Sequence, residues 1–101
     1  MNEKRTATRV HLDYPVSLKI EDDTVSALLV DLSATGALFA FDDDARAEVD
    51  PGVLGLDGSF TIKPKGKPTR LYTGELVRFF VRDGAPHVAI RFWKKYTELT
   101  D

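Results

Sequence analysis

Two short polar motifs contain the residues of this chain that are best suited to bind an anionic ligand. The first, Arg5-Thr-Ala-Thr-Arg9, places two guanidiniums four residues apart on a polar segment. The second, Asp31-Leu-Ser-Ala-Thr-Gly36, places a carboxylate, a hydroxyl and a glycine at the end of an apolar run. Guanidiniums pair with phosphate oxygens and with guanine O6 and N7, and they stack on purine faces. A carboxylate accepts hydrogen bonds from the guanine edge, so the two motifs together suit an anionic ligand that carries a base.

Each motif alone also has an ordinary structural explanation. Arginines at positions 5 and 9 fit a solvated basic tail, whereas Asp31, Ser33 and Gly36 fit a polar turn between two strands. Gly36 would permit either a positive φ or a close approach of the backbone to a ligand. Each motif alone is therefore a weak indication of ligand binding.

The composition indicates one globular domain. The chain has 101 residues, of which 43% are hydrophobic and 10% aromatic. No run approaches the roughly 18 apolar residues of a membrane-spanning helix, and the N-terminus lacks the apolar segment of a signal peptide. We therefore expect no membrane insertion and a cytoplasmic location. The chain has no cysteine, which excludes disulfides and thiolate metal sites.

Charge is spread unevenly along the chain. Residues 21–50 carry nine acidic residues and one basic residue, whereas residues 63–95 carry nine basic and two acidic ones. The formal net charge is −2, although a general nucleic-acid-binding domain is usually basic. Neither DNA nor RNA is therefore expected as a partner.

Apolar and polar residues alternate in several segments, which predicts β-strands. The predicted strands cover residues 10–20, 25–32, 37–41, 54–62, 70–81 and 88–92. Pro15 indicates an edge position or a bulge, because proline cannot donate to a ladder. In the second strand, Leu28, Val30 and Leu32 are expected to face the core, with Asp31 and Ser33 on the opposite face. A phase change in the fifth strand predicts a bulge or bend at Gly74.

About six strands with short connections predict an all-β fold, a small six-stranded antiparallel barrel, because closure removes exposed edges. Residues 1–9 show no periodicity and are expected to form a flexible arm, so that residues 10–101 make up the single barrel domain. The three-residue spacing of Tyr96 and Leu99 suggests a short helical turn within residues 94–101.

The pattern RxxxR followed by DxSxxG, within an all-β chain, resembles the PilZ domain family, whose members bind the bacterial second messenger cyclic di-GMP. The resemblance extends from Arg5 to Phe92. It implies a six-stranded antiparallel barrel, in agreement with the strand pattern. The residues for which it implies ligand contact are Arg5, Arg9, Asp31, Ser33 and Gly36.

Three further residues are candidate contacts. Lys4 precedes the first arginine, where the resemblance implies an influence on whether one ligand or a stacked pair is bound, and it could add a phosphate contact. Arg91 and Trp93 share the outward phase of the last strand. They could form part of a ligand shelf or a partner surface, and a partly covered outer face explains them equally well.

The sequence therefore predicts a cyclic di-GMP receptor whose arm rearranges on binding and signals to a downstream effector protein. The alternative is a PilZ-like adaptor that acts by protein contact and binds no nucleotide. Neither catalysis nor a cofactor is expected. His11 and His87 are far apart in sequence, and Asp42-Asp43-Asp44 does not match a calcium loop, so no metal site is expected either.

Overall fold

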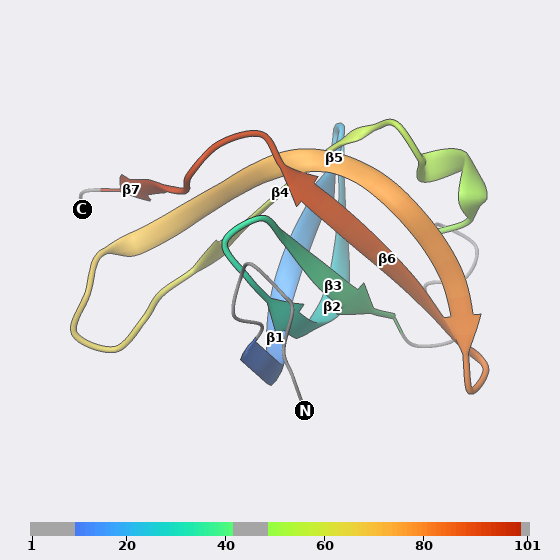
Figure 1. Ribbon diagram of the computed structural model, residues 1–101, viewed down its shortest axis with the longest axis horizontal. Coiled ribbons are helices and arrows are strands. Elements are labelled where there is room, and N and C mark those ends of the chain that lie inside the picture. The colour runs from blue at the N-terminus through green and yellow to red at the C-terminus, as the bar shows by residue number, and fades with distance from the viewer. Residues whose placement is uncertain (1–9, 42–48, 100–101) are drawn as a thin grey trace, which may run out of the picture.

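The computed structural model describes residues 10–41 and 49–99, with side chains from residue 13 onward in the first strand (Figure 1). The predicted arm, with Lys4, Arg5 and Arg9, lies outside the described residues. A short 3-10 helix spans Pro51–Val53. The strands are β1 Val10–Ile20, β2 Asp23–Leu32, β3 Gly36–Ala40, β4 Asp57–Ile62, β5 Thr69–Arg82, β6 Ala85–Phe92 and β7 Thr97–Leu99.

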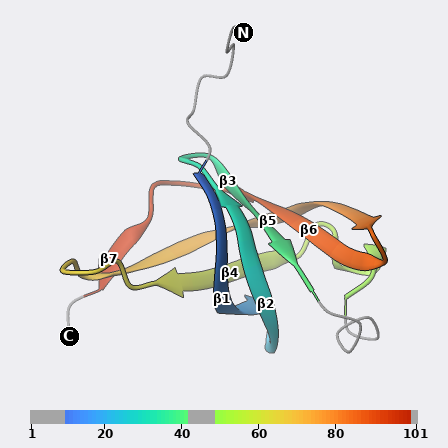
Figure 2. The ribbon, with the colours of Figure 1, turned by 90° about the horizontal axis from the view of Figure 1, so that it is seen from below.

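The strands form two antiparallel meanders that meet at two junctions. The N-terminal meander is β1-β2-β3, and the C-terminal meander is β4-β5-β6, with β7 added to β5. One junction pairs β3 with β6, from Gly36↔Arg91 to Ala40↔His87. The other pairs β1 with β4 (Figure 2). Six strands are thereby closed into a ring, which confirms the predicted antiparallel barrel.

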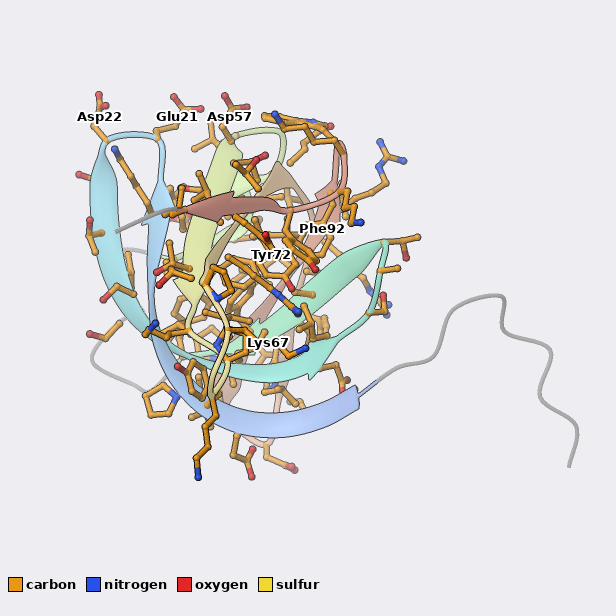
Figure 3. All side chains as sticks on the ribbon, turned by 90° about the vertical axis from the view of Figure 1, so that its left-hand side faces the viewer. Glu21, Asp22, Asp57, Lys67, Tyr72 and Phe92 are labelled. Carbon is orange, nitrogen blue, oxygen red and sulfur yellow. The ribbon has the colours of Figure 1, made fainter. Side chains whose placement is uncertain are left out.

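The junction between β1 and β4 is short. It consists of the pairs Lys19↔Ser59 and Ile20↔Gly58. Two reciprocal hydrogen bonds extend it, because the amide of Glu21 donates to the carbonyl of Asp57 and the amide of Asp57 donates to Glu21 Oε2, both at 3.0 Å. Figure 3 shows Glu21 and Asp57 side by side at this end of the barrel.

The core lies inside the ring, because alternate residues of every barrel strand point inward. Phe39 lies at its centre, fully buried, with its ring edge-on to Phe60 at a centroid distance of 4.9 Å. Phe60 stacks on Tyr72 at 5.0 Å, and Tyr72 contacts Phe92, as Figure 3 shows for the last two. Edge-to-face and stacked aromatic pairs add specific geometry to the area that they bury.

A β-bulge in β2 changes which residues face the core. Leu29 is fully buried, whereas Leu28 and Val30 are only half-buried, so the prediction that the latter two face inward was wrong. The register between β2 and β3 shifts between Leu29 and Asp31. After the shift Leu32 packs against the core, which places Asp31 on the outer face, as predicted.

Two further irregularities affect β1 and β5. The phase change in β5 occurs between Leu76 and Arg78 rather than at Gly74, because the register with β6 shifts there. In β1 the shift lies between His11 and Tyr14, and on its other side β1 pairs with β4 only at its end. Pro15 therefore lies on a strand edge beside a bulge, which confirms the expectation for this proline.

The predicted C-terminal helical turn is wrong for the part of residues 94–101 that the structure describes. Thr97–Leu99 form β7, which pairs with Thr69–Leu71 of β5. Strand β5 extends past the end of β6, and β7 satisfies the backbone groups that would otherwise remain unpaired there. Tyr96 packs on Tyr72, with a centroid distance of 5.3 Å, before β7 begins. The described part of the chain contains no helix of the length and apolar character that a bilayer crossing requires.

Candidate ligand-binding site

A tight turn formed by the second motif connects β2 to β3. The amide of Ser33 donates to the carbonyl of Gly36 at 2.9 Å. The Ser33 hydroxyl accepts from the amides of Thr35 and Gly36, at 3.2 and 3.3 Å. The amide of Phe92 donates to the carbonyl of Thr35 at 2.9 Å, so the turn is fixed to the end of β6. The hydroxyl of Ser33 thus stabilises the turn itself, which is the behaviour expected of a polar turn residue.

Gly36 is required by the close approach of β3 to β6. A Cβ atom at this position would overlap the carbonyl oxygen of Ile90. Its φ is not positive, in contrast to those of Gly55, Gly66 and Gly84. A Cβ at Gly74, on the other neighbour of β6, would likewise overlap the carbonyl oxygen of Arg91. The backbone of β6 is therefore closely flanked by a glycine on each side.

We expect Gly36→Ala to destabilise the protein even without a ligand. The added methyl group would force β3 away from β6, and overpacking of this kind typically costs about 1–3 kcal/mol. Thermal unfolding of the ligand-free variant should show a melting temperature lower by roughly 4–8 °C for each kcal/mol. Ala34→Ser is a suitable control, because it adds one atom at an exposed position of the same turn. An unchanged melting temperature in Gly36→Ala would contradict a structural role for this glycine.

An open hollow of about 410 Å³ lies on the outer face of the barrel, where the two meanders meet. We call it the Asp31 hollow. Four predicted site residues line it, namely Asp31, Ser33, Gly36 and Arg91. Polar and aromatic residues that the sequence analysis did not select also line it, namely Thr35, Arg78, Phe80 and Arg82. Trp93 is 55% exposed and is not among the lining residues, because β6 ends at Phe92 and the chain then bends.

One row of paired residues crosses the floor of the Asp31 hollow. Asp31 is paired with Leu38, Leu38 with Ala89, and Ala89 with Arg78, so the row runs over β2, β3, β6 and β5. Neighbouring strands lie about 4.8 Å apart, which separates the backbones at the two ends of the row by about 14 Å. A half-buried carboxylate thus lies at one end, an exposed guanidinium at the other, and apolar side chains between them.

Positive charge predominates in the Asp31 hollow. Among the described residues that line it, Arg78, Arg82 and Arg91 carry guanidiniums and Asp31 carries a carboxylate. Arg91 also lies 3.9 Å from Glu75, but the Arg91 side chain is 70% exposed, so solvent screens this pair. A formal excess of two positive charges suits a ligand with two negative charges.

Arg78 and Arg82 are held over one aromatic ring. Their guanidinium carbons lie 5.0 and 5.1 Å from the centroid of Phe80. The ring of Phe80 is stacked on that of His87, at 5.0 Å and an interplanar angle of 14°. His87 is buried, and its Nδ1 lies 2.9 Å from the carbonyl oxygen of Ala85. The alternation Arg78-x-Phe80-x-Arg82 was the sequence signal for this cluster, because such residues share one face of a strand.

The first strand of the barrel begins beside the second motif. Val10, the first residue of β1, pairs with Leu32, which lies between Asp31 and Ser33. Arg9 precedes Val10 directly in the sequence, although it lies outside the described residues. Within the described ranges, no group of three or more His, Asp or Glu side chains could hold a metal ion.

The six-stranded antiparallel barrel is the fold that the motif resemblance implies. Residues 3–99 match the PilZ domain family, and the chain belongs to this family. The match includes both motifs.

Among solved structures, the chain is similar to the Bacillus subtilis inhibitor of motility, MotI/DgrA, with a TM-score of 0.67 and 14% sequence identity. The similarity covers 93% of this chain but 44% of that protein, so this chain spans less than half of its length. At this identity the comparison supports the fold alone. No curated protein matches the chain in sequence.

Proposed function

We propose that this PilZ domain is a receptor module for cyclic di-GMP. The observation that supports the proposal best is the Asp31 hollow, because it gathers the residues of the second motif and three guanidiniums around one apolar floor. The start of β1 also supports the proposal, because Val10 pairs with Leu32, next to Asp31 in the chain. Cyclic di-GMP is a dianion with two guanine bases, which matches the charge and the polar groups of this surface.

In the proposed complex, each motif residue has a distinct role. Asp31 accepts hydrogen bonds from the N1–H and N2–H₂ groups of one guanine. Ser33 contacts the guanine edge together with Asp31, and it also holds the turn that forms the wall of the hollow. Gly36 gives the ligand access to the backbone and keeps that wall close to β6. Arg5 and Arg9 bind phosphates and stack on guanine faces, and Lys4 adds a further phosphate contact.

The proposed output is a change in the position of residues 1–9 that a downstream effector protein senses. The domain would bind and release its ligand without catalysis. The alternative is an adaptor that binds no nucleotide, and it predicts no binding in a titration with cyclic di-GMP.

Cyclic di-GMP should raise the melting temperature, whereas GMP and cyclic AMP should do so weakly or not at all. At a free ligand concentration of about 100 Kd, binding to the folded state adds ~2.7 kcal/mol to the free energy of unfolding. For a domain of this size that corresponds to a shift of roughly 10 °C or more, measured by thermal unfolding. Asp31→Asn, which removes the acceptor charge, should reduce the shift. No shift with millimolar cyclic di-GMP would refute the receptor function and favour the adaptor.

A further inference from the structure

We infer that Arg78, Phe80 and Arg82, supported by His87, form a second recognition site within the Asp31 hollow. We call this group the Phe80 shelf. It would take the part of a cyclic dinucleotide that Asp31 cannot reach, namely the second base and its neighbouring phosphate. The inference rests on the proposed function and assigns residues that neither motif contains.

The geometry of the Phe80 shelf suits this role because its cations are already held in place. A guanidinium over an aromatic face is favoured by electrostatic attraction to the ring. Two of them lie within 5.1 Å of the Phe80 centroid, and the ring is in turn stacked on a buried histidine. The long arginine side chains therefore lose less conformational freedom when a ligand binds.

The position of the shelf relative to Asp31 indicates what it recognises. Asp31 and Arg78 lie at opposite ends of the row that crosses four strands, about 14 Å apart at the backbone. A single guanine whose edge is bound by Asp31 would lie over β2 and β3. A dinucleotide would extend along the apolar floor formed by Leu38 and Ala89, and its second half would arrive at the shelf.

The chemistry of the shelf suits a purine next to a phosphate. The planar face of a guanidinium stacks on any purine, and its N–H groups donate to phosphate oxygens at the same time. Phe80 would act as a positioning residue, because its ring holds the guanidiniums of Arg78 and Arg82 and these bind the ligand. The shelf would thus discriminate a dinucleotide from a mononucleotide by binding its second half.

The test measures the binding of two ligands to the wild-type protein and to shelf variants. Calorimetry measures the affinity for cyclic di-GMP, and NMR titration measures the weaker affinity for GMP. Arg78→Gln removes an exposed cation from the shelf, and Lys65→Gln removes an exposed cation from the loop between β4 and β5. We expect Arg78→Gln and Phe80→Leu to weaken cyclic di-GMP binding about 10- to 100-fold. The weak affinity of Arg78→Gln and Phe80→Leu for GMP should equal that of the wild type. The control Lys65→Gln should bind cyclic di-GMP like the wild type. Phe80→Tyr, which keeps an aromatic ring, should retain most of the affinity for cyclic di-GMP.

The outcomes separate this inference from the proposed function. Wild-type affinity for cyclic di-GMP in both Arg78→Gln and Phe80→Leu would overturn the shelf and leave the receptor function intact. An equal loss of GMP and cyclic di-GMP binding would also overturn it, because the shelf would then not act on the second half alone. A wild-type protein that binds no cyclic di-GMP would overturn both proposals. The melting temperature of ligand-free Arg78→Gln should match that of the wild type, since this side chain is exposed.

Discussion

Deletion of residues 1–9 should weaken cyclic di-GMP binding at least ~100-fold and leave the melting temperature of the ligand-free protein almost unchanged. The deletion removes Arg5 and Arg9, and each charge-assisted contact is worth about 1.5–3 kcal/mol, or roughly 10- to 150-fold in affinity. The folded barrel should tolerate it, because the closed ring and its core begin with β1 at Val10. Calorimetric titration and thermal unfolding measure the two effects separately.

Deletion of residues 1–3 alone provides the matched control, since it retains Lys4, Arg5 and Arg9. This shorter deletion should bind cyclic di-GMP with nearly wild-type affinity. Unfolding of the protein without residues 1–9 would show that this segment belongs to the core of the domain. Wild-type affinity after the same deletion would show that the first motif does not bind the ligand.

Phe39→Ala should lower the free energy of unfolding by about 3–5 kcal/mol, the usual cost of removing a buried phenylalanine ring. Phe39 is fully buried and packs edge-on against Phe60, so the cavity would lie in the middle of the barrel. A loss of this size is a large part of the 5–15 kcal/mol that typically stabilises a domain. Urea-induced unfolding measures it directly.

Leu38→Ala tests the same strand on its opposite face. Leu38 is half-buried on the floor of the Asp31 hollow, so its truncation should cost clearly less stability than that of Phe39. Equal losses in the two variants would contradict the assignment of an inner and an outer face to β3.

Much of the fold followed from local patterns. The alternation over residues 10–20 predicted the bounds of β1. Asp83-Gly84, a dipeptide typical of hairpin turns, connects β5 to β6, and both residues have positive φ. The bulges in β2 and β5 were harder to locate, because they depend on the partner strand rather than on the residues at the bulge. The C-terminal strand was missed for a similar reason, since only the free edge of β5 at Thr69–Leu71 makes Thr97–Leu99 a strand.

The candidate site was only partly accessible from the sequence. The second motif is contiguous, so Asp31, Ser33 and Gly36 could be named together. Arg78 and Phe80 are more than forty residues away in the chain, and only the register of β3, β6 and β5 brings them to the same hollow. Trp93 was selected as if the alternation of β6 continued, but the strand ends one residue earlier. The predicted ligand contacts remain predictions for every candidate residue, namely Lys4, Arg5, Arg9, Asp31, Ser33, Gly36, Arg91 and Trp93.

The Asp31 hollow lies across the junction of the two meanders. Asp31 and the turn at Ser33 belong to the first meander, whereas Arg78 and Arg91 belong to the second. A molecule that binds both sides would tie together the two meanders, whose other backbone pairing in the described part of the chain is the short one between β1 and β4. Fluctuations that separate the halves would have to release the ligand first, so they become rarer by the factor 1 + [L]/Kd. The concentration of the ligand would therefore set how rarely this junction opens.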